Sequence, residues 1–131
     1  ALSEYDQTLY EDDKTNRMDE ALMLFHSMIN NGAFKKTSFI LFLNKKDLFE
    51  EKLKKVPLTF WAKDYVGSGE YEDCVAFVRQ KFVALNEQPG RTIFVHTTCA
   101  TDKNNVQAVF TAVRDIVIRQ GLKNAGLLEE D

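Results

Sequence analysis

Two short polar motifs each follow an apolar run in this chain. Asn44-Lys45-Lys46-Asp47 comes after the run at residues 38–43, and Thr98-Cys99-Ala100-Thr101 comes after the run at residues 92–96. Both runs are typical of strands. Ligands of open α/β sheets bind beyond the carboxyl ends of the strands. The spacing therefore predicts that the two motifs form one binding site.

The first motif predicts that the ligand is a guanine base. Guanine presents its N1–H and its exocyclic N2–H₂ side by side, and one carboxylate accepts hydrogen bonds from both. Adenine does not offer this pair. Asp47 is the candidate acceptor, and its charge makes the two hydrogen bonds strong. Leaving them unmade with the wrong base is costly, which is the source of the discrimination.

The neighbouring residues suit the same task. Lys45 can lay its aliphatic stem over the face of the base. Asn44 can either tie the two loops together or reach the edge of the base. The small Ala100 lets a backbone N–H approach guanine O6. The remaining members of the second motif shape and hold the turn: Thr98, Cys99 and Thr101.

The match to N-K-x-D alone is weak, because Asn-Lys-Lys-Asp is also a common polar loop. Its place after a strand, with the second motif after the next strand, favours the guanine interpretation. No G-x-x-x-x-G-K-[ST] sequence occurs in the chain. The sequence therefore predicts a chain that selects the base without a standard phosphate-binding loop.

Length and composition narrow the other possibilities. The 131 residues suit one domain, and a net charge of −3 gives no indication of a nucleic-acid partner. Cys74 and Cys99 are expected to be free thiols, and the sequence predicts no metal site or catalytic residue. Cys99 taken alone is more typical of an inert core residue, and His26 and His96 lack metal-ligand spacing.

Hydrophobic periodicity predicts an α/β protein. Helices are expected at residues 18–29, 48–55 and 71–85, and from an apolar stripe at 106–117 to an end near Gly121, with buried parallel strands at 38–43 and 92–96. The strand–helix–strand order implies a right-handed crossover. Two strands do not make a self-sufficient parallel sheet, since such sheets need cover on both faces. We therefore expect the chain to be part of a nucleotide-binding domain.

Several segments of the chain resemble the heterotrimeric G protein alpha subunits, in order and spacing. They are Ala1-Leu2-Ser3-Glu4-Tyr5-Asp6, Asn16-Arg17-Met18, Phe39 to Phe49, Thr98 to Asp102, and Gly126-Leu127. The resemblance covers nearly the whole chain. It implies that residues 1–131 are the carboxyl-terminal part of a single Ras-like P-loop NTPase domain, whose mainly parallel sheet is covered by helices on both faces.

The resemblance also implies roles for individual residues. The guanine pocket would comprise Asn44, Lys45, Asp47, Cys99, Ala100 and Thr101. An acidic loop similar to the third switch would contain Glu11, Asp12 and Asp13, and Glu20 resembles an acid that anchors the second switch. Receptor coupling would involve Val117, Lys123, Gly126, Leu127 and Leu128.

The family implies GTP and GDP as ligands, with Mg²⁺ held by residues outside this chain. It implies a G protein beta-gamma dimer, a G protein-coupled receptor, regulators of G protein signalling and effectors as partners, at the cytoplasmic face of the plasma membrane. The parent protein would be a GTPase. The groups that catalyse phosphoryl transfer would precede Ala1, so this chain alone is not expected to hydrolyse GTP.

Two alternatives remain open. The chain could be a non-catalytic module that binds a receptor or an effector through its last helix. It could also come from another branch of small GTPases, although these usually carry a serine-alanine-lysine type of second motif, which disfavours that assignment. Nucleotide binding separates the first alternative from a signalling GTPase.

Overall fold

The computed structural model describes most of the chain, namely residues 1–35, 37–88, 90–91, 93–99, 103–124 and 126. The helices and strands follow one another as α1 (Arg17–Ile29), β1 (Phe39–Asn44), α2 (Lys46–Leu53), α3 (Tyr71–Val83), β2 (Ile93–Thr98) and α4 (Lys103–Asn124). Three short 3-10 helices complete the described secondary structure: η1 (Leu2–Glu4), η2 (Gly32–Phe34) and η3 (Leu58–Phe60).

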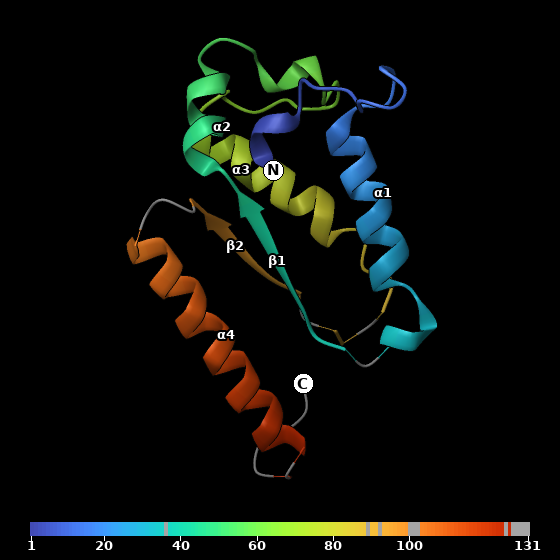
Figure 1. The fold of residues 1–131 in the computed structure, drawn as a ribbon, viewed down its shortest axis with the longest axis vertical. Coiled ribbons are helices and arrows are strands. Elements are labelled where there is room, and N and C mark those ends of the chain that lie inside the picture. Colours follow the sequence, from blue (N-terminus) through green and yellow to red (C-terminus); the bar gives the residue numbers. More distant parts are fainter. Residues whose placement is uncertain (36, 89, 92, 100–102, 125, 127–131) are drawn as a thin grey trace.

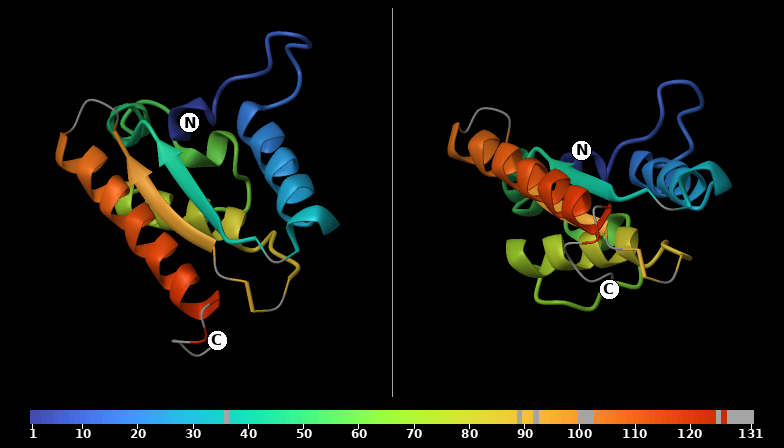
Figure 2. Two further views of the ribbon diagram at one scale, coloured as in Figure 1. Left: turned by 60° about the horizontal axis from the view of Figure 1, so that its bottom comes forward. Right: turned by 90° about the horizontal axis from the view of Figure 1, so that it is seen from below.

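The two strands form a parallel pair. Phe39 lies opposite Ile93 at one end, and Asn44 lies opposite Thr98 at the other. Helix α4 lies on one face of this sheet and α3 on the other (Figures 1 and 2). The parallel pairing and the helices on both faces confirm the predicted α/β class. Strand β2 runs to Thr98, two residues past the predicted end, so the second motif begins inside the strand.

The hydrophobic core lies between α1, α3 and the inner face of the sheet. Ile29, Cys74 and Val78 are each 0% exposed. The rings of Phe25 and Phe82 join α1 to α3, with centroids 5.5 Å apart. Such edge-to-face contacts add to the free energy gained from burial alone. Cys74 therefore lies in the core, and neither it nor the buried Cys99 forms a disulfide.

Local sequence sets the limits of α1. The Asn16 side chain accepts hydrogen bonds from the backbone N–H groups of Met18 (2.7 Å) and Asp19 (3.3 Å). An asparagine at this position satisfies donors that the first turn of a helix leaves unpaired. The helix ends at Ile29, directly before Asn30-Asn31-Gly32. The predicted helix at residues 18–29 is thus confirmed to within one residue.

One expectation about burial was wrong. Strand β1 was expected to be buried on both faces, but Phe42 is 37% exposed and Leu43 is its only buried member. Among the described residues, β1 has a neighbouring strand on one side only. The apolar stripe of α4 is only partly covered, as expected for part of a larger domain: Phe110 is 73% and Val117 is 64% exposed, whereas Val113 and Ile116 are half-buried. Helix α4 contacts β2, and the two-stranded sheet is too narrow to cover the whole apolar face of this helix.

Helix α4 is the longest described element, with 22 residues. Neither α4 nor any other helix in the described part of the chain is both long and apolar enough to cross a membrane.

We expect Gly67→Ala to destabilise the chain by about 1–3 kcal/mol, because overpacking a filled site forces neighbours to shift. A methyl group at Gly67 would lie 2.4 Å from the Tyr65 hydroxyl, and Tyr65 is only 9% exposed. That hydroxyl also accepts a hydrogen bond from the Gly69 N–H at 2.9 Å. Thermal denaturation would measure the loss. Gly32→Ala is the control, since nothing lies within 4 Å of its added methyl, and equal losses in both variants would contradict the prediction.

Candidate nucleotide-binding site

The carboxyl ends of the two strands bring the two motifs together. Asn44 and Thr98 are register partners, and the Thr98 hydroxyl donates a hydrogen bond to Asn44 Oδ1. The Asn44 side chain therefore ties the two strand ends together, which is the first of its two expected roles. Its amide N–H₂ has no partner among the residues that the structure describes. Those donors remain available to a ligand beyond the strand ends.

Lys45 forms the sharp turn between β1 and α2. Its backbone lies in the left-handed region, at φ 62° and ψ 45°. Few residues other than glycine adopt this conformation, and it persists only where the surrounding structure enforces it. The turn lets α2 begin at Lys46, immediately beyond the strand. The exposed Lys45 side chain thereby lies next to the strand ends.

Asp47 lies in the first turn of α2 and is exposed. A carboxylate at this end of a helix is favoured by the helix dipole. No described residue donates a hydrogen bond to its oxygens. The acceptor that the guanine interpretation requires is therefore present and available at the edge where both strands end.

The structure describes only part of the second motif. Thr98 is the last residue of β2, and Cys99 is 8% exposed directly after it. Ala100 and Thr101 lie outside the described residues. Helix α4 begins at Lys103, so only a short connection separates the end of β2 from this helix.

The acidic loop is a closed turn next to α1. Asp12 accepts hydrogen bonds from the Lys14 N–H (2.9 Å), the Thr15 hydroxyl (2.7 Å) and the Thr15 N–H (3.0 Å). These three bonds hold the pKa of the Asp12 carboxyl below its usual value, and the bond from the Lys14 N–H has the largest effect. Asp13 has a left-handed backbone, at φ 55°. Glu11 is exposed beside them, and Glu20 is half-buried near the start of α1.

The proposed receptor-coupling residues extend along α4 and beyond it. Val117 is exposed on the helix, and Gly126 has a positive φ of 76°. The side chain of Lys123, together with Leu127 and Leu128, lies outside the part that the structure describes.

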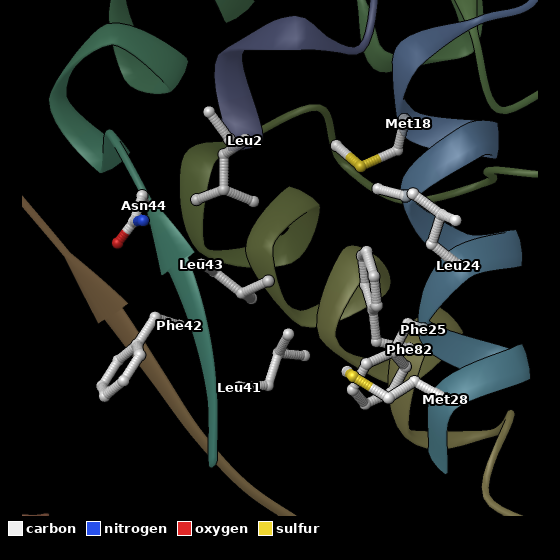
Figure 3. Close-up of a pocket in the computed structure, with 12 residues that line it drawn as sticks. Leu2, Met18, Leu24, Phe25, Met28, Leu41, Phe42, Leu43, Asn44 and Phe82 are labelled. Atoms are coloured by element: carbon white, nitrogen blue, oxygen red, sulfur yellow. The ribbon is translucent and has the colours of Figure 1, made fainter. Parts of the chain in front are cut away.

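An apolar groove of about 520 Å³ runs beside the unpaired side of β1 (Figure 3). Leu41 and Leu43 point toward Phe25 and Phe82, whereas Phe42 points the other way. Asn44 lies at the end of the groove. Within the described residues, no three His, Cys, Asp or Glu side chains lie close enough together to hold a metal ion.

Backbone strain at Lys45 leads to a prediction. Lys45→Gly should be more stable than Lys45→Ala by about 0.5–1 kcal/mol, because alanine keeps the steric cost of a left-handed backbone and glycine removes it. Both variants lose the side chain that would cover the base, so both should bind a guanine nucleotide more weakly and to the same extent. Thermal denaturation and nucleotide titration measure the two effects. Equal stability of the variants would contradict the left-handed assignment.

The two motifs meet at the carboxyl ends of adjacent parallel strands, which is where α/β proteins bind their ligands. A family model described as "G-protein alpha subunit" matches residues 1–117. The chain belongs to this family.

Three relatives share the description "Guanine nucleotide-binding protein G(o) subunit alpha". Over 127 residues, the chain is 54% identical to the protein of Locusta migratoria, 53% to that of Lymnaea stagnalis and 52% to that of Caenorhabditis elegans. Each match covers 97% of this chain and 36% of the relative. The chain thus spans about a third of the length of the curated relatives that it matches.

Proposed function

We propose that this chain supplies the guanine-binding part of a heterotrimeric G protein alpha subunit that alternates between GDP-bound and GTP-bound states. The observation that carries the proposal is the meeting of the two motifs at one sheet edge. There, Thr98 is hydrogen-bonded to Asn44, and the Asp47 carboxylate has no described donor. A paired N1–H and N2–H₂ donor, as in guanine, satisfies that carboxylate.

GTP hydrolysis belongs to the whole protein in this proposal. Phosphoryl transfer depends on groups that position and neutralise the phosphates, and the chain contains no P-loop sequence. Mg²⁺ would neutralise phosphate charge when bound. Its ligands would lie outside this chain, as the resemblance to the family implies. The residues of this chain bind and orient the base.

The proposed partners are a beta-gamma dimer, a G protein-coupled receptor, regulators of G protein signalling and effectors, at the cytoplasmic face of the plasma membrane. Support comes from family membership and from the position of α4. This helix begins at Lys103, shortly after the second motif, and ends at Asn124. A partner that displaces its far end would therefore also displace the turn beside the base.

A hybrid protein tests the proposal. The segment of the locust relative that matches this chain is replaced by this chain, and nucleotide binding and receptor-stimulated GDP release are measured. The proposal predicts that the hybrid binds GDP in preference to ADP and releases it faster with an activated receptor. A hybrid that folds but shows no preference for guanine would overturn the assignment of the base site. Guanine selectivity without receptor stimulation would overturn only the transducer role.

A further inference from the structure

The amino-terminal segment of the chain is fastened to α2, the helix that bears Asp47. Tyr5 is 0% exposed, and its ring meets that of Phe49 edge-on, with centroids 5.5 Å apart. Its hydroxyl donates a 2.6 Å hydrogen bond to the backbone carbonyl of Val56, beyond the end of α2. Burial, and then the charge of Asp6, raise the pKa of Tyr5, which keeps this hydroxyl protonated as a donor.

Lys52 makes a second connection on the same helix. Its Nζ donates to the backbone carbonyl of Ser3 at 2.6 Å and to Asp6 Oδ1 at 2.7 Å. The Lys52 and Asp6 side chains are 23% and 21% exposed. Ion pairs that are largely shielded from water are weakened less by solvent and salt than exposed pairs. Removing either charge would leave the other without its partner in a shielded position.

The segment is also held from its other side. Asn16 Nδ2 donates to the Tyr5 carbonyl at 2.7 Å, while the same side chain caps α1 through its oxygen. Thr8 and Asn16 form an isolated antiparallel bridge, and Arg17 Nε donates to the Thr8 carbonyl at 3.0 Å. The residues around Tyr5 are therefore anchored to α1 and to α2 at once. They link the core to the short helix that carries the base acceptor.

The length of α2 makes this link important for Asp47. The helix has only eight residues, and Phe49 is its single buried one. Short helices in isolation are marginally stable, and most of their stability comes from packing. Hence the orientation of the first turn depends on contacts made further along the helix. Phe49 packs against Tyr5 and also against Tyr71 of α3, and Lys52 bonds to residues 3–6.

We propose that Lys52, paired with Asp6, is a positioning residue for guanine recognition, which fixes the orientation of α2 and thereby of the Asp47 carboxylate. Lys52 itself does not touch the nucleotide. This inference rests on the proposed function, since it concerns how the same base site attains its selectivity. Two hydrogen bonds from one carboxylate to N1–H and N2–H₂ need a narrow range of carboxylate orientations. A less firmly held α2 should thus weaken the hydrogen bond between the Asp47 carboxylate and N2–H₂ most.

The experiment compares GDP with inosine diphosphate, whose base lacks the N2–H₂ group. Affinities are measured on the full 131-residue chain by ligand-detected NMR, and again in the hybrid protein. Lys52→Met should lower the preference for GDP over inosine diphosphate by about three- to tenfold, because the interaction that is weakened is the hydrogen bond from N2–H₂ to Asp47. Lys52→Arg should retain most of the preference. Lys54→Met is the matched control, because Lys54 lies just past the end of α2, is 69% exposed and pairs only loosely with Glu51.

The outcomes distinguish a wrong base site from a wrong positioning role. If the unaltered chain shows no preference for GDP over inosine diphosphate, the proposed base site is wrong. If it does show one and Lys52→Met leaves it unchanged while the fold is intact, the positioning role is wrong. Asp6→Asn serves as a second variant should Lys52→Met fail to fold, with the same expected direction. In an Asp47→Ala background, Lys52→Met should have no further effect on the ratio, and a persisting effect would contradict the route through Asp47.

Discussion

Replacing Asp47 with asparagine should shift base preference from guanine toward xanthine. The amide supplies one acceptor oxygen where the carboxylate supplied two, so the pairing with N1–H and N2–H₂ is lost. Xanthine offers an acceptor at position 2, which the amide N–H₂ can satisfy. The expected loss of GDP binding free energy is about 2–4 kcal/mol, typical of breaking a charged hydrogen-bonded pair.

Titration of GDP and xanthosine diphosphate into the hybrid protein measures this shift. Glu50→Gln is the control, because Glu50 is another exposed carboxylate on α2 and has no role in the proposed site. The control should bind both nucleotides as the unaltered protein does. If Asp47→Asn keeps its preference for GDP, Asp47 is not the guanine acceptor.

The second large effect is self-association of the 131-residue chain purified by itself. The groove beside β1 has a volume of about 520 Å³, and Leu24 and Met28 at its border are 59% and 47% exposed. Apolar surface of this kind next to an unpaired strand edge promotes association. We expect the chain to self-associate, and Leu24→Lys should shift the population toward monomer.

Sedimentation velocity at several concentrations measures the population. Val66→Lys is the matched control: Val66 is 95% exposed, but it does not line the groove. It should leave association unchanged. A chain that sediments as a monomer and unfolds in one sharp transition would contradict the prediction, and would mean that these residues form a stable domain by themselves.

Local patterns in the sequence were sufficient to predict the main elements. The spacing of apolar residues from Met18 to Ile29 predicts α1, because an amphipathic stripe against a core has this period. Apolar runs that end in polar motifs predict the parallel strands. The common location of Asn44 and Thr98 then follows from the rule that parallel strands end at the same edge, and the register confirms it.

Other features depend on contacts between distant residues, which a local pattern does not encode. The hydrogen bond from Tyr5 to Val56 and the pair of Lys52 with Asp6 span about fifty residues, and neither was predicted from the sequence. Periodicity likewise identifies the apolar face of α4, but not which of its residues another element covers. The left-handed backbone of Lys45 was also missed, because it arises from the strand-to-helix turn rather than from a glycine.

The most direct test of the central claim is a comparison of GDP and ADP by amide-detected NMR on the full chain. Base contacts without a phosphate-binding loop should give weak binding, so saturating nucleotide concentrations are needed. We expect GDP to shift the amide signals of Asn44, Lys45, Asp47, Thr98 and Cys99, and ADP at the same concentration to leave them in place. Equal shifts with both nucleotides, or shifts by GDP confined to other parts of the chain, would contradict a guanine site at the ends of these two strands.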